Sequence, residues 1–416
     1  MTDPLTLDGY GLLPVRRPAT VAELGTLIRD AKAAGQGVYP IGGGTTLDVG
    51  MPPIKPGIAV DLRGLANVID YPARDMTITV QAGITVAAIR SALTKEGQRL
   101  PVDVPGSPSA TLGGALALNQ SGPRRLFRGT MRDYVIGMSF LTDDGTEVKG
   151  GGRVVKNVAG YDLMKLQIGA VGTLGIISQV TLKVTPTPED QAFVAFGVNA
   201  AAVGPTLDRL HASASRPVAV ELLNAAAAKL VSATSGVKLP EFEPWVLLVG
   251  FEEKSTTVSW QLSTLKEELK TAPVRDVSDV RGIACEPLWA AITEMQIRPE
   301  SRFIWKVNVL PSRVAEFVSR VTADTPYGVH AHALSGIVWL HAPEEFDPAS
   351  GANVSAMEHA AQAAGGTQVV RRCPTEWKSR LRVWGRPLGD RDLMRTVKRT
   401  VDPANVFNPG RFFGDI

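Results

Sequence analysis

The fold of the first part of the chain is decided by the stretch Gly37-Val38-Tyr39-Pro40-Ile41-Gly42-Gly43-Gly44-Thr45-Thr46. Its first five residues predict a strand, which delivers the glycines and threonines as a loop. Glycines let backbone N–H groups converge on a phosphate with no Cβ in the way, and the threonine hydroxyls add further donors. A plain tight turn has the same composition, so this loop alone leaves its role open.

Two common nucleotide-binding motifs do not fit this loop. Leu47 stands where the third glycine of the Rossmann dinucleotide fingerprint would fall. The Gly-Lys-Ser/Thr sequence of a Walker A loop does not follow either. The loop therefore argues against NAD and ATP as ligands.

Two more segments of similar character follow before residue 185. The second runs from Pro105-Gly106-Ser107 through Thr111-Leu112-Gly113-Gly114 to Asn119-Gln120-Ser121-Gly122. Its small residues let backbone approach a flat ligand, and its hydroxyl and amide groups offer hydrogen bonds. The third contains Gly160-Tyr161 and Gly172-Thr173-Leu174-Gly175-Ile176-Ile177. Three such segments in one domain indicate a cofactor site far more specifically than any one of them.

Composition limits the remaining possibilities. The 416 residues suit two domains, and the 44 basic and 41 acidic residues are too nearly balanced to indicate nucleic acid or anionic lipid as a partner. Cys285 and Cys373 form no metal-binding pair, which fits a reduced cytoplasmic setting. We expect no secretory signal and no membrane span. Any contact with the inner face of a membrane would then be made through a partner protein.

The predicted fold class is α+β. The first domain, residues 1–185, is expected to contain two small α+β subdomains and to end where Pro186 and Pro188 interrupt the pattern. From 190 to 395, strands alternate with longer helices, which predicts an α+β cap domain with an antiparallel sheet. Residues 396–416 are expected to return to the first domain.

The order of the motifs resembles that of a known flavoprotein superfamily. The residues that carry the resemblance are Gly42–Thr45, Ala110–Gly114, Gly160–Leu163, Gly172–Ile176, Asn119–Arg125, Gly129–Asp133, Asp402-Pro403 and Phe407–Phe412. They resemble the FAD domain of the vanillyl-alcohol oxidase and p-cresol methylhydroxylase (PCMH) superfamily. Within it, the chain is most similar to the FAD-binding subunits of bacterial glycolate oxidases.

The resemblance implies a PCMH-type FAD-binding domain and FAD as the cofactor. The cofactor-binding residues it implies are Gly42, Gly43, Gly44, Thr45, Thr46, Pro105, Gly106, Ser107, Thr111, Gly113, Gly114, Asn119, Gly122, Gly160, Tyr161, Gly172, Gly175, Ile176, Ile177, Asn408 and Arg411. Superfamily members that bind flavin covalently often use a histidine in the first loop, where this chain has threonines. We therefore expect non-covalent FAD.

Catalytic candidates in the second domain are fewer. His330 and His332 faintly resemble a histidine pair of related 2-hydroxy acid oxidases, and their spacing puts both on one strand face. The acidic and amide residues that usually follow are absent, so a pair of ordinary strand histidines is the preferred interpretation and we expect no metal. The catalytic candidates are His332 and Arg382. Arg382 belongs to a basic cluster that could hold a carboxylate, dock an acidic partner or simply form a solvated surface; its members are Arg371, Arg372, Lys378, Arg380, Arg382 and Arg386. Lys306 is a milder candidate.

The function implied by the resemblance is oxidation of a 2-hydroxy acid, glycolate to glyoxylate, by hydride transfer to N5 of a flavin that lies between the two domains. The implied partners are a second FAD subunit and an iron–sulfur subunit. Two alternatives stay open at this point: a non-catalytic or electron-relay flavin subunit, and a self-sufficient FAD oxidase of another hydroxy acid or alcohol.

Overall fold

The computed structural model describes residues 4–152, 162–241, 243–298, 300–323, 327–343, 346, 352–414 and 416. Contacts divide the chain into two compact units. The first contains residues 1–120, 130–187 and 386–416, and the second contains 121–129 and 188–385. The units differ from the expected boundaries in two places: the C-terminal return begins ten residues earlier, and residues 121–129 belong to the second unit.

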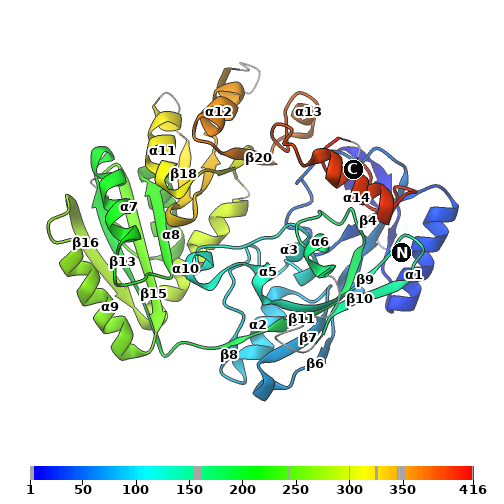
Figure 1. Ribbon diagram of the computed structural model, residues 1–416, viewed down its shortest axis with the longest axis horizontal. Coiled ribbons are helices and arrows are strands. Elements are labelled where there is room, and N and C mark those ends of the chain that lie inside the picture. Colours follow the sequence, from blue (N-terminus) through cyan, green and yellow to red (C-terminus); the bar gives the residue numbers. More distant parts are fainter. Residues whose placement is uncertain are drawn as a thin grey trace. The chain divides into compact units, whose positions relative to one another are not determined.

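The first unit begins with a small parallel sheet in the order β3-β5-β4, formed by Val15–Arg16, Gly57–Asp61 and Gly37–Ile41. Helix α1 (Val21–Ala33) covers it, starting at Thr20, whose side chain accepts the N–H of Glu23. The end of the chain joins this sheet, because Val38 pairs with Phe407 in a parallel bridge. Strand β4 therefore delivers the first glycine loop beside the C-terminal segment (Figure 1).

A five-stranded antiparallel sheet forms the rest of this unit. Its order is β10-β9-β11-β7-β6, formed by Glu147–Gly151, Val135–Leu141, Ile176–Lys183, Thr77–Gln81 and Val68–Asp70. Helices α2 (Val86–Thr94) and α3 (Leu112–Ala117) pack on it in one apolar core. The smaller elements are β1 (Leu5–Leu7), β2 (Tyr10–Leu13), β8 (Gln98–Arg99), β12 (Thr185–Pro186), α5 (Met131–Tyr134), α6 (Met164–Gln167) and α14 (Arg391–Val401).

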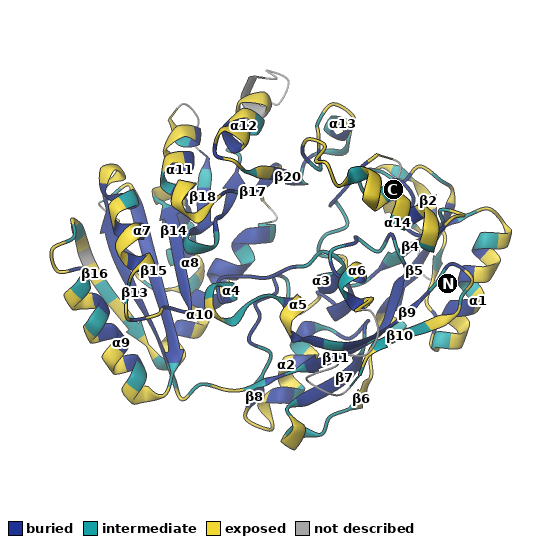
Figure 2. Ribbon diagram, in the orientation of Figure 1, coloured by how far each residue is buried: buried dark blue, intermediate teal, exposed yellow. Residues whose placement is uncertain are grey.

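The second unit is built on one eight-stranded antiparallel sheet. Its order is β16-β13-β15-β14-β18-β19-β17-β20, formed by Val274–Arg281, Asp190–Val198, Trp245–Glu253, Ala219–Asn224, Gly328–His332, Ile337–His341, Ile304–Asn308 and Thr367–Arg372. Figure 2 shows β13, β14 and β15 buried along nearly their whole length. Such strands read as continuous apolar runs rather than alternating ones. The α+β prediction is confirmed.

Helices cover this sheet on both faces. Helices α8 (Ala225–Ser235) and α10 (Glu286–Glu294) pack over β13, β15 and β14 in one core cluster. The others that pack on the strands or on one another are α7 (Val203–His211), α9 (Ser255–Glu268), α11 (Val314–Thr322), α12 (Ala352–Ala363) and the short α4 (Arg125–Arg128). Helix α13 (Thr375–Lys378) follows β20.

An ion pair anchors residues 121–129 in the second unit. Nε of Arg124 donates to Oε1 of Glu252 at 2.7 Å, and its guanidinium lies 3.8 Å from the ring centroid of Trp289. Glu252 is 1% exposed and Arg124 is 8% exposed. Low exposure strengthens both the charge pair and the cation–π contact. Helix α4 follows directly and packs on β14.

Candidate functional site

A cavity in the first unit is lined by the predicted glycine-rich segments. It encloses about 1000 Å³, including space open to solvent. The predicted residues that line it are Gly42, Gly43, Gly44, Thr45, Thr46, Thr111, Gly113, Gly114, Gly172, Gly175, Ile176, Ile177, Asn408 and Arg411. Residues that sequence reasoning did not single out also line it, among them Leu7, Val49, Leu62 and Gln167. No glycine or turn signal marks these apolar and amide side chains.

Some predicted residues lie elsewhere. Pro105, Gly106, Ser107 and Asn119 do not line the cavity, and Gly122 belongs to the second unit. Gly106 supports the cavity indirectly, because its carbonyl accepts the N–H groups of Ser109 and Ala110 and shapes the turn before α3. Gly160 and Tyr161 lie outside the described residues.

The first glycine loop is pressed against the second. A Cβ on Gly42 would collide with the Thr111 hydroxyl, and a Cβ on Gly43 would collide with the carbonyl oxygen of Ser109. Gly44 has φ of 76°, a left-handed conformation that glycine adopts without strain. The N–H groups of Gly43, Gly44 and Thr45 donate to no acceptor in the described part of the chain. The loop thus presents a row of unsatisfied donors.

The other walls are fixed by backbone hydrogen bonds. Thr111 caps α3 by accepting the N–H of Gly114 at 3.3 Å, and the N–H of Gly113 donates to the carbonyl of Ala82 at 2.8 Å. Val171 takes a positive φ of 57°, and its carbonyl accepts Nδ2 of Asn408 at 2.7 Å. Each wall therefore has a single, well-determined position.

Arg411 ties the first loop to the chain end. Its guanidinium donates to Asp8 at 2.9 Å and to the carbonyls of Leu47, Val49 and Met51 at 2.5, 2.7 and 2.5 Å. Arg411 is 4% exposed. Because four of its N–H donors serve the protein, its main action is to shape the loop.

The second unit brings a third residue to the two predicted histidines. Oε2 of Glu221 lies 2.7 Å from Nε2 of His330 and 2.8 Å from Nδ1 of His332. The three side chains are at most 2% exposed. Glu221 was not predicted, since its only sequence signal is one acid in the apolar strand Ala219–Leu223.

The two imidazoles keep the buried Glu221 side chain in its carboxylate form. Burial would raise the pKa of Glu221, but His332 and His330 lower it to about 2. Burial also lowers the pKa of His330, with Glu221 opposing. Each imidazole donates one N–H to Oε2, and Nε2 of His332 and Nδ1 of His330 have no partner in the described chain. The triad's ligand atoms lie within 4.8 Å of one another, so a divalent ion would compete with these hydrogen bonds.

Lys306 lies on the same sheet face. Strand register places His330, Trp339 and Lys306 directly opposite one another on β18, β19 and β17. Directly opposed residues of antiparallel strands point to the same face, so the backbones of His330 and Lys306 lie about 10 Å apart. Burial, with Arg371 and Arg125 close by, lowers the pKa of Lys306 to about 7. Its ammonium lies 5.7 Å from the centroid of the Trp339 ring and has no ion pair within the described residues.

Arg382, the other catalytic candidate, lies at the surface. It pairs with Glu358 at 2.9 Å, and its side chain is 65% exposed. Lys378, from the same basic cluster, is buried. The cluster is therefore not one continuous basic surface.

Comparison with known proteins gives two domain matches. Residues 13–151 match an FAD binding domain, and residues 186–325 and 389–412 match the C-terminal domain of FAD linked oxidases. The chain is an FAD-linked oxidoreductase. Its fold is similar to that of p-cresol methylhydroxylase, with a TM-score of 0.73 at 17% identity over 95% of this chain and 88% of the other.

Three relatives illustrate this oxidoreductase's similarity to characterised proteins. It is 26% identical to the glycolate oxidase subunit GlcD of Bacillus subtilis, over 90% of this chain and 83% of the relative. It is 26% identical to a D-lactate dehydrogenase of Archaeoglobus fulgidus, over 95% and 90%. A shorter match of 133 residues is 38% identical to the glycolate oxidase subunit GlcE of Escherichia coli, covering 32% and 38%.

The cavity fits FAD, the cofactor of this oxidoreductase. The free N–H groups of the first loop suit a pyrophosphate, and none of the described lining residues carries a carboxylate that would repel it. The apolar side chains of Leu118, Ile176 and Ile177 suit a flat ring system. No helix in the described part of the oxidoreductase is long and apolar enough to cross a membrane.

Replacing Gly43 by alanine is expected to impair FAD uptake. The new Cβ would force the first loop away from Ser109, and such overpacking costs about 1–3 kcal/mol. We expect the dissociation constant of FAD, measured by fluorescence titration, to rise about 5- to 150-fold. Gly11→Ala is the control, because a Cβ there meets no atom within 4 Å. Wild-type affinity in Gly43→Ala would refute the role given to this loop.

Proposed function

We propose that this oxidoreductase converts a 2-hydroxy acid, glycolate, to its 2-oxo acid, with Lys306 binding the carboxylate and His332 accepting the hydroxyl proton. The observation that carries the proposal is the Lys306 ammonium, which has no ion pair within the described residues and shares a sheet face with the Glu221 triad. The names of the GlcD and D-lactate dehydrogenase relatives support a substrate of this class.

Lys306 suits a carboxylate because the protein leaves its charge uncompensated. A cation surrounded by protein costs free energy unless an anion accompanies it. Arg371 and Arg125 add positive potential around it. A bound carboxylate would offset this cost, and a charge-assisted hydrogen bond to an ammonium contributes about 1.5–3 kcal/mol. Lys306, with Arg371 and Arg125 near it, would therefore favour substrates that carry a carboxylate over neutral alcohols.

His332 suits the role of general base because Glu221 fixes its tautomer. A carboxylate that accepts Nδ1–H leaves the lone pair on Nε2, the arrangement by which buried acids orient catalytic histidines. Nε2 would take the hydroxyl proton while the C–H bond gives up its electron pair as hydride. FAD, when bound, supplies the acceptor of that hydride. The ionised Glu221 would stabilise the imidazolium that forms.

We further propose that FAD is bound without a covalent link and that the chain works inside a complex. None of the described residues lining the cavity is a histidine, cysteine or tyrosine that could attach the flavin. The names of the GlcD and GlcE relatives support a glycolate oxidase of several subunits. Its other members would be a second FAD subunit and an iron–sulfur subunit, which would hold the chain at the inner face of a membrane. Arg382 is then free to contribute to docking rather than to catalysis.

The decisive experiment mixes the purified, FAD-loaded chain with glycolate or D-lactate under anaerobic conditions. We expect glycolate to bleach the flavin absorbance, because hydride transfer needs no second protein. Co-purification of an iron–sulfur protein would support the complex. A loaded chain that neither substrate bleaches, alone or in the complex, would contradict the proposed reaction and favour an electron-relay role.

Lys306→Met is expected to raise KM for the hydroxy acid about 10- to 100-fold, since one charge-assisted hydrogen bond is lost. In the wild type, the ammonium is present below its pKa of about 7 and is lost as the pH rises, so kcat/KM should fall above about pH 7. Lys306→Arg keeps its charge and should flatten this fall. Arg382→Ala, which removes an exposed arginine, is the matched control. An equal rise of KM in Lys306→Met and Arg382→Ala would argue against Lys306 as the carboxylate site.

His332→Asn is expected to slow flavin bleaching about 10²- to 10⁴-fold, the usual contribution of a general base. FAD content should stay at the wild-type level, because the cavity lies in the other unit. His341→Asn provides a control at another buried histidine of the sheet, one that bonds Ser301 instead. Loss of activity on chelation, with recovery on adding a divalent ion, would replace the base role by metal binding.

A further inference from the structure

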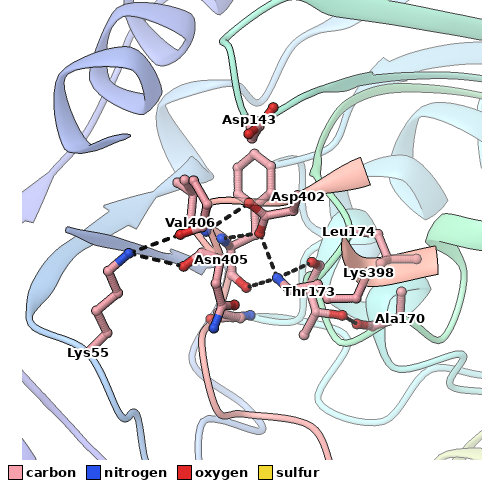
Figure 3. A network of polar contacts seen from close by, with 12 residues as sticks. Lys55, Asp143, Ala170, Thr173, Leu174, Lys398, Asp402, Asn405 and Val406 are labelled. Atoms are coloured by element: carbon pink, nitrogen blue, oxygen red, sulfur yellow. Dashed lines mark hydrogen bonds and ion pairs between the residues drawn. The ribbon is translucent and has the colours of Figure 1, made fainter. Parts of the chain in front are cut away.

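A buried lysine of α14 joins the C-terminal segment to a loop of the FAD cavity (Figure 3). Nζ of Lys398 donates to the carbonyl of Thr173 at 2.8 Å, to the carbonyl of Phe407 at 3.0 Å and to Oδ2 of Asp402 at 2.6 Å. An ammonium has three donors, and here all three serve the protein. Lys398 is only 4% exposed. It therefore acts on its three partners and not on solvent.

Asp402 organises the other side of this contact. It is 1% exposed, and its two oxygens accept the N–H groups of Val406 and Phe407 at 2.8 and 2.9 Å. Burial lowers the pKa of Lys398, and the charge of Asp402 opposes that shift. A buried pair is tolerated only when its remaining hydrogen bonds are satisfied, which is the case here. The pair thus holds residues 402–407 in one conformation.

The loop that receives Lys398 forms a wall of the cavity. Thr173 lies between Gly172 and Gly175, two residues that line the cavity, and its own side chain is buried with 1% exposure. Asn408 binds the carbonyl of Val171, two residues before that of Thr173. The C=O and N–H of a trans peptide point in opposite directions, so holding these carbonyls also sets the direction of the next N–H groups. The chain end thereby dictates the shape of residues 171–175.

We propose that Lys398 and Asp402 are a positioning pair that keeps residues 171–175 in the conformation that binds FAD. The pair contacts backbone and not the cofactor, so it acts through Thr173. This inference rests on FAD binding and is independent of the hydroxy acid, of Lys306 and of His332.

The test compares FAD binding by apoproteins. Lys398→Met alone would strand a buried carboxylate, so the variant used is Lys398→Met/Asp402→Asn, which removes both charges and keeps one side-chain oxygen as the acceptor for Val406. We expect its FAD dissociation constant to rise at least tenfold while the apoprotein still unfolds in one cooperative thermal transition. At saturating FAD, the visible circular dichroism of the flavin should also change, since the wall beside it has moved.

Two further variants make the result specific. Lys398→Gln/Asp402→Asn retains an amide that can donate to Thr173, so it should recover part of the lost affinity. Lys55→Met is the matched control: Lys55 donates to the carbonyls of Ala404 and Asn405 in the same segment (Figure 3) but not to the cavity loop. Its FAD dissociation constant should stay within twofold of the wild type.

Several outcomes would overturn the inference. These are wild-type affinity and dichroism in the double variant, an equal loss in Lys55→Met, no recovery with glutamine, or a wild-type chain that takes up no FAD. A chain that fails to bleach with glycolate but shows the expected change in FAD affinity would refute the proposed reaction and leave this inference standing.

Discussion

The FAD cavity depends on the anchoring of the chain end by buried cations. Arg411 binds Asp8 and three carbonyls of residues 47–51, and Lys398 binds Thr173 and Phe407. Arg411 and Asp8, which are 403 positions apart in the sequence, thus lie together beside the cavity. Arg411 donates to carbonyl groups of residues 47–51 and so fixes the shape of the segment after the first glycine loop. The N–H groups of that loop are not used in these bonds and can donate to an anion. The cavity is therefore complete only when the last residues have folded back.

The second unit contains both a cation that is paired within the protein and one that is not. Arg124 is paired with Glu252 and packs on Trp289, so its buried charge is compensated within the protein. Lys306 has no such anion in the described part of the chain, and its neighbours Arg371 and Arg125 are also positively charged. An uncompensated cation destabilises the fold that holds it, unless a ligand supplies the missing charge. The structural cations are thus paired with protein anions, whereas the candidate binding cation has no ion pair within the described residues.

Sequence reasoning located the cofactor more completely than the chemistry. Glycine is required where Gly43 meets Ser109, and this requirement is visible as a motif, so most of the glycine-rich lining was predictable. FAD itself was implied by the resemblance to a flavoprotein superfamily that the order of these motifs carries. Arg411 was predicted as a cofactor ligand, but its bonds to three carbonyls could not be foreseen, because they depend on how residues 47–51 turn. Glu221 was missed since its contact with His330 spans 109 positions and arises from strand order alone.

The cofactor cavity lies in one unit and the candidate substrate residues lie in the other. This separation is consistent with relatives that are 26% identical over nearly the whole chain and whose names refer to different substrates. The first glycine loop offers FAD backbone N–H groups, which many side-chain changes leave in place as long as the glycines remain. Substrate recognition, on the proposal made above, depends on a few side chains of β14, β17 and β18 that share one sheet face. Because side chains of a strand alternate between faces, a single substitution at Lys306 or His332 alters that face without disturbing the core behind it. Substrate preference can therefore change while the cofactor site stays constant.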